Sequence, residues 1–320
     1  MFHYDRGLFL TRPGLAVDVR RRQSCAFVSH AHSDHLAPHQ LALCTPPTAR
    51  LYRLRMGSRE VVELPYQQPR QWGGVWLTAL PAGHCLGSAM LYVEDGSESL
   101  LYTGDFKLGC SATAQAAELC RADVLIIEST YGDPQYRHPP REAAISQLLE
   151  TVEGIFARGA TPVIAAYALG KAQEVSRILT QHGIPVLQHH DAMTVSRVYF
   201  ECGVDLGAVA LYEDGPLPGH AVVAPPAKCR PHALPGLTRY ETIAVTGWAA
   251  RANASARLRV DHAVPLSDHA DFDELLAAIE RVSAQEVYCT HGPAQFVELL
   301  RARGVNAHRL ESGRRPPFHR

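Results

Sequence analysis

The chain has 320 residues, 46% of them hydrophobic, and a formal net charge of −1. That length and hydrophobic content can bury a large core in one domain or in two closely joined domains. The near-neutral net charge does not exclude a nucleic-acid partner, because a local basic groove is sufficient to hold phosphates. No uninterrupted apolar run is long enough to span a bilayer, so we expect no membrane association.

The eight cysteines and the N-terminus indicate a cytoplasmic protein. The cysteines include no Cys-x-x-Cys pair, and several lie in apolar, strand-like segments. We therefore expect reduced thiols in a core. The first residues lack the apolar centre of a signal peptide.

Residues 1 to about 130 are predicted to form strands with short connections. Alternating apolar residues indicate a strand at 74–80, and a hairpin is predicted from 89–94 and 99–103 around Asp95-Gly96. The apolar run at 122–128 predicts a buried strand that ends in an acid, Glu128.

From residue 141 the apolar period becomes helical, and Gly159 is the predicted stop. A strand at 161–166, a helix at 171–182 and a strand at 184–188 then form a Rossmann-like unit. After a Pro-rich stretch at 216–235, helices and strands alternate again. These later elements are strand 242–246, helix 272–282, strand 286–290, helix 293–303 and strand 305–310.

The most informative segment is His30-Ala31-His32-Ser33-Asp34-His35, which follows an apolar run. Imidazole and carboxylate groups are ligands of zinc and similar cations, and alternate residues at a strand end point to the same side. His30 and His32 can thus hold one ion, and Asp34 and His35 a second ion nearby. The alternative is a His-rich surface loop.

This string resembles the signature of the metallo-β-lactamase fold. That resemblance implies further ligands at other strand ends, and His84 and Asp105 occupy suitable positions, with Asp105 able to bridge two cations. It also implies that Asp18 accepts a hydrogen bond from a ligand imidazole and fixes its tautomer. Taken singly, each of these residues would have an ordinary turn, cap or core explanation.

Four later segments resemble the β-CASP nucleases, a branch of this fold that acts on RNA or DNA. The motif residues are Glu128 in Glu-Ser-Thr-Tyr-Gly, His269 in Ser-Asp-His-Ala-Asp, and His291 in Thr-His-Gly. The fourth segment, Gly170-Lys171-Ala172-Gln173-Glu174, resembles a conserved turn of the family that can hold a phosphate. The resemblance covers nearly the whole chain.

Within the family, the chain most resembles the bacterial ligase-associated DNA exonucleases. The implied fold is α/β, an αββα metallo-β-lactamase sandwich with an inserted Rossmann-like β-CASP domain. We expect the sandwich at 1–135 and 242–313, the insert at 136–241 and a flexible basic tail at 314–320. His291 departs from eukaryotic DNA-repair members, which tend to carry Val there, and matches RNA enzymes.

The resemblance implies a two-metal hydrolysis of phosphodiesters. Two divalent ions, zinc or alternatively manganese, would activate a water for in-line attack on DNA, and His269 would protonate the leaving oxygen. Glu128 and Asp268 would orient His269, with Asp34 and Glu128 counted among the catalytic residues. The expected metal ligands are His30, His32, Asp34, His35, His84, Asp105 and His291. The expected phosphate contacts are Ser129, Gly170, Lys171 and Trp248.

Several alternatives stay open from the sequence. An RNA-processing exonuclease or endonuclease would use the same residues, whereas a small-molecule metallo-hydrolase would not need Lys171, His269 or Glu128. An inactive scaffold subunit would have lost ligands. Nucleic acid is the expected partner, DNA rather than RNA, and the resemblance adds an ATP-dependent DNA ligase and a helicase.

Overall fold

The computed structural model describes residues 1–310, and the predicted basic tail at 314–320 lies outside them. The chain forms two units. The first unit comprises Met1–Cys110, Ala114–Pro134 and the segment from Phe272 onward, and the second comprises Ser111–Thr113 and Gln135–Asp271.

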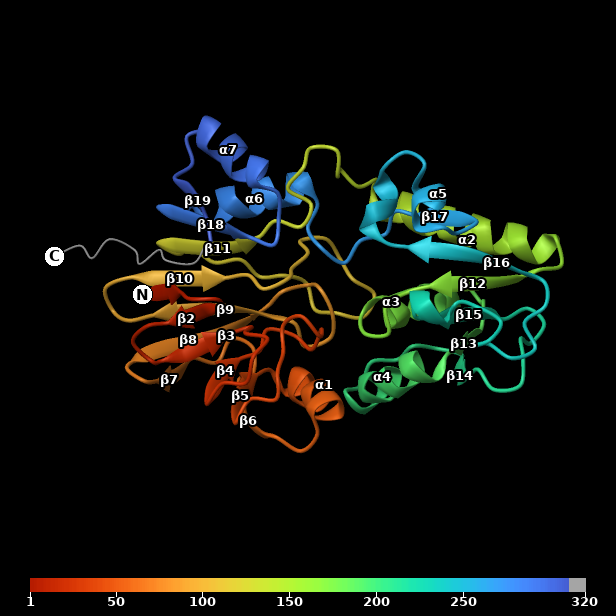
Figure 1. Cartoon of the computed structure of the whole chain (residues 1–320), viewed down its shortest axis with the longest axis horizontal. Coiled ribbons are helices and arrows are strands. Elements are labelled where there is room, and N and C mark those ends of the chain that lie inside the picture. The colour runs from red at the N-terminus through yellow and green to blue at the C-terminus, as the bar shows by residue number, and fades with distance from the viewer. Residues whose placement is uncertain (311–320) are drawn as a thin grey trace. The chain divides into compact units, whose positions relative to one another are not determined.

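The first unit contains two sheets (Figure 1). One has the order β1-β2-β3-β4-β5-β6 and the other β19-β18-β11-β10-β9-β8-β7. The strands of the first sheet are β1 (Phe2–Tyr4), β2 (Leu8–Leu10), β3 (Leu15–Val17), β4 (Cys25–Phe27), β5 (Leu41–Cys44) and β6 (Glu60–Glu63). Those of the second are β7 (Arg70–Trp72), β8 (Val75–Pro81), β9 (Ala89–Glu94), β10 (Ser99–Tyr102), β11 (Val124–Glu128), β18 (Glu286–Thr290) and β19 (Ala307–Arg309).

Both sheets contribute to one buried core. Leu10 and Phe27 from the first sheet and Leu77, Leu91 and Ile126 from the second belong to the same cluster of buried apolar side chains. The strands alternate as predicted, since β8 buries every second residue. The helices of this unit are α1 (Pro46–Met56), α6 (Phe272–Val282) and α7 (Ala294–Ala302).

Helix α1 was not predicted. Its start nevertheless carries two recognisable signals. The hydroxyl of Thr45 caps the helix by accepting from the backbone N–H of Thr48, and prolines occupy the first turn. The apolar residues of α1 are few, so periodicity alone does not show the helix.

The second unit is built on a parallel sheet with the order β14-β13-β15-β12-β16-β17. Its strands are β12 (Thr161–Ala165), β13 (Val186–Gln188), β14 (Val209–Leu211), β15 (Ala221–Ala224), β16 (Tyr240–Val245) and β17 (His262–Val264). Its helices are α2 (Arg141–Ala157), α3 (Lys171–Gln181), α4 (His190–Glu201), α5 (Ala254–Leu258) and the short turns η1 (Pro226–Lys228) and η2 (Gly247–Ala250). Strand β15 and helix α4 were also not predicted.

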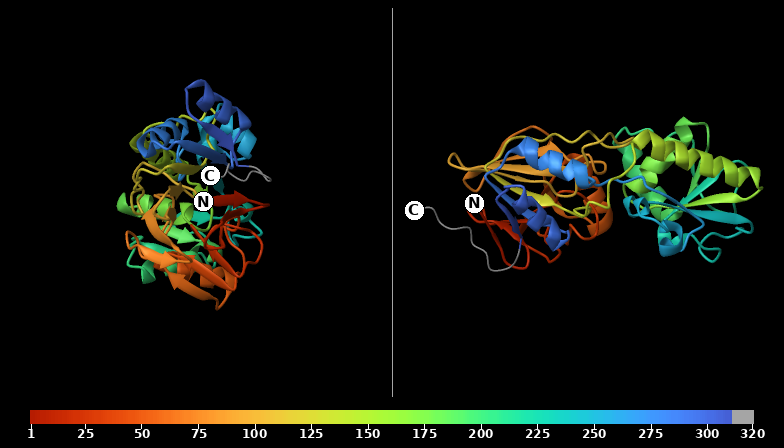
Figure 2. Two further views of the ribbon diagram at one scale, coloured as in Figure 1. Left: turned by 90° about the vertical axis from the view of Figure 1, so that its left-hand side faces the viewer. Right: turned by 90° about the horizontal axis from the view of Figure 1, so that it is seen from above.

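The two faces of this sheet are covered differently. Side chains of α2, α3 and α4 pack with Ile164, Val186 and Ile243 on one face, whereas Val163 and Val222 on the other face pack against the irregular segment after β15. In the view from above in Figure 2, α2 lies along the sheet.

The predicted end of the insert at residue 241 is wrong. Strand β16 pairs in parallel with β12 from Thr161↔Tyr240 onward, and β17 pairs with β16. Residues 242–271 therefore belong to the second unit. The apolar pattern of a strand does not indicate which sheet the strand joins, so the sequence did not show that β16 and β17 belong to the second unit.

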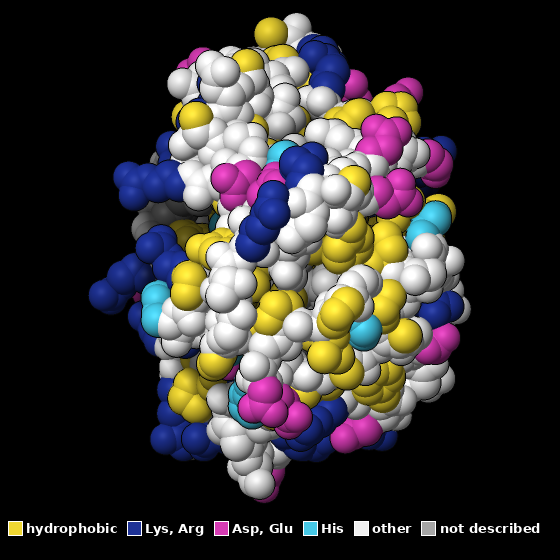
Figure 3. Space-filling model, turned by 90° about the vertical axis from the view of Figure 1, so that its right-hand side faces the viewer, with side chains coloured by type: hydrophobic (Ala, Val, Ile, Leu, Met, Phe, Trp, Pro, Cys, Tyr) yellow, Lys and Arg dark blue, Asp and Glu magenta, His cyan; other side chains and the backbone are white. Residues whose placement is uncertain are grey.

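One end of the second unit exposes hydrophobic side chains (Figure 3). Leu217 is 53% exposed, and it borders a hollow together with Phe156, Pro216 and Pro218. The eight cysteines are all free thiols. Among residues 1–310, no helix has both the length and the apolarity needed to cross a membrane.

Candidate metal centre

The predicted metal ligands of the first unit gather at the ends of strands from both of its sheets. His30, His32, Asp34 and His35 follow β4 of one sheet. The others follow strands of the second sheet, where His84 comes after β8, Asp105 after β10 and His291 after β18. Residues that are far apart in sequence thus lie close together in space.

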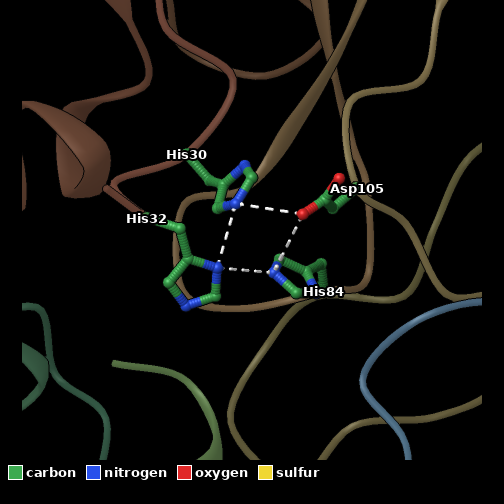
Figure 4. A group of neighbouring side chains, drawn as sticks. All are labelled: His30, His32, His84 and Asp105. Atoms are coloured by element: carbon green, nitrogen blue, oxygen red, sulfur yellow. Dashed lines mark hydrogen bonds and ion pairs between the residues drawn. The ribbon is translucent and has the colours of Figure 1, made fainter. Parts of the chain in front are cut away.

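Four of these side chains point toward one another (Figure 4). The Nδ1 atom of His32 lies 3.0 Å from Nε2 of His30 and 3.0 Å from Nε2 of His84. The Oδ2 atom of Asp105 lies 3.4 Å from Nε2 of His30 and 3.9 Å from Nε2 of His84. Ligand atoms around a tetrahedral zinc lie roughly 3.3 Å apart, for bonds of about 2.0 Å. The four side chains therefore fit one cation.

The carboxylate of Asp105 also faces a second group of ligands. The same Oδ2 atom lies 3.3 Å from Nε2 of His35. His35, Asp105 and His291 place one ligand atom each within 4.8 Å of one another. Asp34 lies at the margin, with its Oδ2 atom 3.9 Å from Nε2 of His35 and its side chain 59% exposed. Asp105 thus occupies the position expected of a ligand shared by two cations.

Asp18 holds His35 in one tautomer. The Oδ2 atom of Asp18 lies 2.8 Å from Nδ1 of His35 and also accepts from the hydroxyl groups of Ser29 and Tyr102. Because a carboxylate only accepts, Nδ1 of His35 donates to Asp18, and Nε2 is the nitrogen that faces Asp105. Burial raises the pKa of Tyr102, and Asp18 adds to that effect, so Tyr102 remains a donor.

The chemistry of the buried atoms also fits cations. Nε2 of His35 is buried and makes no hydrogen bond with any described residue. Burial lowers the pKa of His30 well below its ordinary value, which favours the neutral imidazole that binds a metal. Burial alone would lower the pKa of His35 as well, but Asp105 and Asp18 raise it well above its ordinary value. A cation would replace that proton.

Comparison with curated proteins finds several relatives, one of which matches 95% of the chain. The chain is 36% identical over 308 residues, 95% of its length, to a "Probable DNA ligase" of Opitutus terrae. It is 33% identical over 180 residues, 48% of its length, to an "RNase J-like protein" of Methanocaldococcus jannaschii. A third relative, at 34% over 147 residues, is "Cleavage and polyadenylation specificity factor subunit 3" of Dictyostelium discoideum. The chain belongs to the metallo-β-lactamase/β-CASP family.

The chain spans only part of each of these relatives, namely 30% of the Opitutus protein, 43% of the RNase J-like protein and 19% of the Dictyostelium subunit. No family model matches it. Among solved structures, a protein of unknown function from Enterococcus faecalis superposes with a TM-score of 0.54 at 14% identity, over 83% of this chain and 75% of that one. This likeness shows a shared α/β fold alone.

In this β-CASP family member, Glu128 and Ser129 lie in the first unit and are almost fully buried. The Oε1 atom of Glu128 accepts from the backbone N–H of Phe106, next to Asp105, at 2.9 Å. The hydroxyl of Ser129 donates to the carbonyl of Thr290, next to His291, at 3.0 Å. Both residues therefore fix the backbone beside predicted metal ligands, and a phosphate contact by Ser129 would require its hydroxyl to leave Thr290.

The segment Gly170–Glu174, in the second unit, is also held by internal hydrogen bonds and ion pairs. The backbone N–H of Gly170 donates to Oε1 of Gln173, and the ammonium of Lys171, 1% exposed, lies 2.8 Å from Oε2 of Glu174. Arg141 pairs with Glu174 from the other side at 2.8 Å. Burial alone would raise the pKa of Glu174, but Lys171 and Arg141 hold it below its ordinary value. A phosphate contact by Lys171 would therefore compete with Glu174.

The last predicted site residues also lie in the second unit. A carboxylate oxygen of Asp268 lies 3.8 Å from Nζ of Lys171, which joins Asp268 to the Glu174 pair. The backbone N–H of His269 donates to the hydroxyl of Ser267 at 3.0 Å, so the turn that carries His269 is bonded locally. Trp248, in η2, is 37% exposed and meets the Tyr136 ring edge-on at 5.0 Å.

The sequence interpretation missed Ser29 and Tyr102, which complete the bonding of Asp18. Ser29 directly precedes His30, and Tyr102 is the last residue of β10, three residues before Asp105. Position next to a ligand is the only signal that the sequence offers for them. Gln173 was quoted as part of a motif, but its bonds to Gly170, Ala168 and Ser196 were not foreseen.

Proposed function

We propose that this chain is a metal-dependent nuclease that hydrolyses phosphodiester bonds of DNA from a free end, in DNA repair. In this proposal the first unit is the αββα metallo-β-lactamase sandwich and the second is the Rossmann-like β-CASP domain. The observation that carries the proposal is the shared position of Asp105, whose Oδ2 atom lies 3.4 Å from a nitrogen of His30 and 3.3 Å from a nitrogen of His35.

Two divalent cations, zinc or alternatively manganese, would polarise the phosphate and lower the pKa of a water when bound. His30, His32 and His84 would hold one of them, Asp34, His35 and His291 the other, and Asp105 both. Asp18 orients His35 for this purpose by accepting from Nδ1 at 2.8 Å, which leaves Nε2 as the nitrogen that can face the cation. The donor set contains no thiolate, which suits zinc or manganese rather than a soft cation.

His269 is the proposed general acid. Its imidazole would give a proton to the oxygen that leaves the scissile phosphate, a contribution of about 10²–10⁴-fold to the rate. Asp268 and Glu128 are proposed to orient His269. Lys171, at the start of α3, would help to hold Asp268, and with it the turn that carries His269, through its contact with Asp268.

DNA is preferred as the substrate because the match over 95% of the chain is to a protein named a probable DNA ligase. That match also supports a role beside an ATP-dependent ligase. The RNase J-like protein and the polyadenylation factor favour RNA as a second candidate, and His291 agrees with them.

Matched substrates separate these candidates. End-labelled linear single-stranded DNA, the same DNA as a covalently closed circle, and RNA of the same sequence are incubated with the metal-loaded protein. The proposal expects fast degradation of the linear DNA and resistance of the circle. Equal cleavage of circle and line would show an endonuclease, and faster cleavage of RNA would select the second candidate.

The protein with His30→Ala and His84→Ala serves as the control, since it lacks two ligands of one cation but keeps the second unit. Hydrolysis of thioesters or lactones by the wild-type protein, without any nuclease activity, would reject both candidates in favour of a small-molecule hydrolase.

A further inference from the structure

A large pocket lies wholly within the second unit, on the sheet face opposite helices α2, α3 and α4. Its volume is about 780 Å³. Small side chains of β12 and β16, Ala165 and Ala244, form its floor, and α5 and the segment after β15 contribute its walls. Pockets of roughly 300–1,000 Å³ are typical of small-molecule and cofactor sites.

The lining of the pocket carries more positive than negative charge, with two arginines and one aspartate. Arg230 and Arg259 line it, both exposed, and within residues 1–310 neither guanidinium has an ion pair or hydrogen bond. The one acidic residue of the lining is Asp261, whose carboxylate is already bonded to the backbone N–H and the hydroxyl of Thr242, both at 2.7 Å. The pocket therefore favours an anion.

Two exposed aromatic side chains line the same pocket. Tyr167, after β12, is 62% exposed, and Trp248, after β16, is 37% exposed. Both follow the carboxyl ends of parallel strands, where open α/β sheets bind ligands. Exposed rings beside guanidinium groups suit a ligand with a planar ring and a phosphate, because bases stack on aromatic rings and arginine binds phosphate through two hydrogen bonds.

The backbone at Arg259 gives an independent reason to assign its side chain a role. Arg259 ends α5 with φ 57° and ψ 49°, in the left-handed region. Glycine is the usual residue at such a helix end, because a Cβ atom makes this conformation unfavourable. Stability therefore does not explain an arginine at this position, and its side chain lines the pocket.

We propose that this pocket binds a nucleotide, with its base against Tyr167 or Trp248 and its phosphate between Arg230 and Arg259. The nucleotide is either free or part of a nucleic-acid strand. The proposal goes beyond the nuclease function at Tyr167, Arg230 and Arg259, none of which is an expected metal ligand or phosphate contact, whereas Trp248 is also an expected phosphate contact.

Binding is measured by calorimetry on the metal-loaded full chain with AMP, adenosine and inorganic phosphate, none of which contains a phosphodiester bond to cleave. We expect AMP to bind, and adenosine and phosphate each to bind at least about tenfold more weakly. The Arg230→Ala/Arg259→Gly variant should lose AMP affinity by about tenfold or more, while its melting temperature stays equal or rises because glycine relieves the strain at residue 259.

Arg197→Ala is the matched control, since Arg197 is an exposed arginine of α4, the helix packed on the opposite face of the sheet. It should bind AMP as the wild type does. A competition arm uses a short oligonucleotide with cleavage-resistant phosphorothioate linkages. Displacement of AMP identifies a nucleotide of a strand as the ligand, and failure to displace it identifies a free nucleotide.

Undiminished AMP binding in the folded double variant would overturn the proposal and place AMP elsewhere, for instance at the metal centre. Absence of AMP and oligonucleotide binding to the wild type at millimolar concentration would overturn it as well. Neither result depends on turnover, so failure of this proposal is distinguishable from failure of the nuclease proposal.

Discussion

Replacing Asp18 by Asn should weaken metal binding although Asp18 itself is not a proposed ligand. The Asp18 carboxylate accepts from the backbone N–H of Ser29 at 2.8 Å, from the Ser29 hydroxyl at 2.5 Å, from Tyr102 at 2.9 Å and from Nδ1 of His35 at 2.8 Å. An amide has nearly the same shape, but one of its two ends can only donate.

In Asp18→Asn, the NH₂ group would face the atoms that now donate to Oδ2. The hydroxyl groups of Ser29 and Tyr102 can rotate, whereas the His35 ring must change tautomer to accept from the amide. That change puts a proton on Nε2, the atom that lies 3.3 Å from Asp105 and faces the proposed cation. Loss of such a supporting hydrogen bond typically lowers metal affinity about 10–100-fold, which corresponds to about 1.4–2.7 kcal/mol.

The assay is a zinc competition titration against a chromophoric chelator, with wild type, Asp18→Asn and Tyr102→Phe compared. Tyr102→Phe removes one donor to Asp18 but leaves the carboxylate and the His35 tautomer in place, so it should lower the affinity far less than Asp18→Asn. Zinc affinity within twofold of wild type in a correctly folded Asp18→Asn protein would refute the reasoning.

Three further predictions concern catalysis and stability. His269→Ala should keep both metals and bind DNA but cleave it about 10²–10⁴-fold more slowly in single-turnover digestion, and loss of metal from this variant would show that His269 is a ligand instead. Glu174→Gln removes the counterion that Lys171 and Arg141 share and leaves Lys171 with the more distant Asp268 alone, so its free energy of unfolding in urea should fall by about 3–5 kcal/mol. Because the folded-state pKa of Glu174 is lowered, its stabilisation is present above its unfolded pKa of about 4.3 and is lost as the pH falls through the folded value. The difference in melting temperature between wild type and Glu174→Gln should therefore shrink below about pH 4, and a constant difference down to pH 3 would speak against this account. Gly292→Ala should lower the melting temperature and disturb His291, since a Cβ atom at residue 292 would lie 2.0 Å from the Ser129 carbonyl oxygen. Gly154→Ala in α2 is the control, because the nearest atom there is the tip of the flexible Arg158 side chain. It should leave the melting temperature equal or higher.

The sequence was sufficient to predict most elements that have a regular apolar pattern. The helix expected at 272–282 is α6, with the same bounds, and the strand expected at 286–290 is β18. The hairpin around Asp95-Gly96 joins β9 and β10, which pair in antiparallel register. In each case one local pattern, either alternation or a helical period, determines the element.

Elements without such a pattern were not predictable in this way. Helix α1 buries few apolar residues, and β15 (Ala221–Ala224) is a four-residue strand within a Pro-rich stretch. The assignment of β16 and β17 to the second unit depends on pairing with β12, which is a long-range property that no local pattern records.

In the candidate site, the ligands were predictable from the sequence but the residues that support them were not. Ligand types were readable from His30-x-His32-x-Asp34-His35, because the motif itself specifies chemistry. The bonds that hold those ligands come from residues without a motif of their own, such as Tyr102. Likewise, Glu174 pairs with both Lys171 and Arg141, and Arg141 lies thirty residues before Lys171 in the chain, so the sequence alone predicted a phosphate contact by Lys171 and not this buried cluster.

In the proposed function, bound divalent cations at the Asp105 centre enable cleavage of a nucleic-acid chain. The most direct measurement adds zinc or manganese stepwise to metal-free protein and follows hydrolysis of end-labelled linear DNA, with bound metal determined in the same samples by elemental analysis. The account predicts no cleavage without metal and activity that rises until two equivalents are bound, with Asp105→Ala inactive throughout. Full activity of the metal-free protein, or of Asp105→Ala, would contradict it.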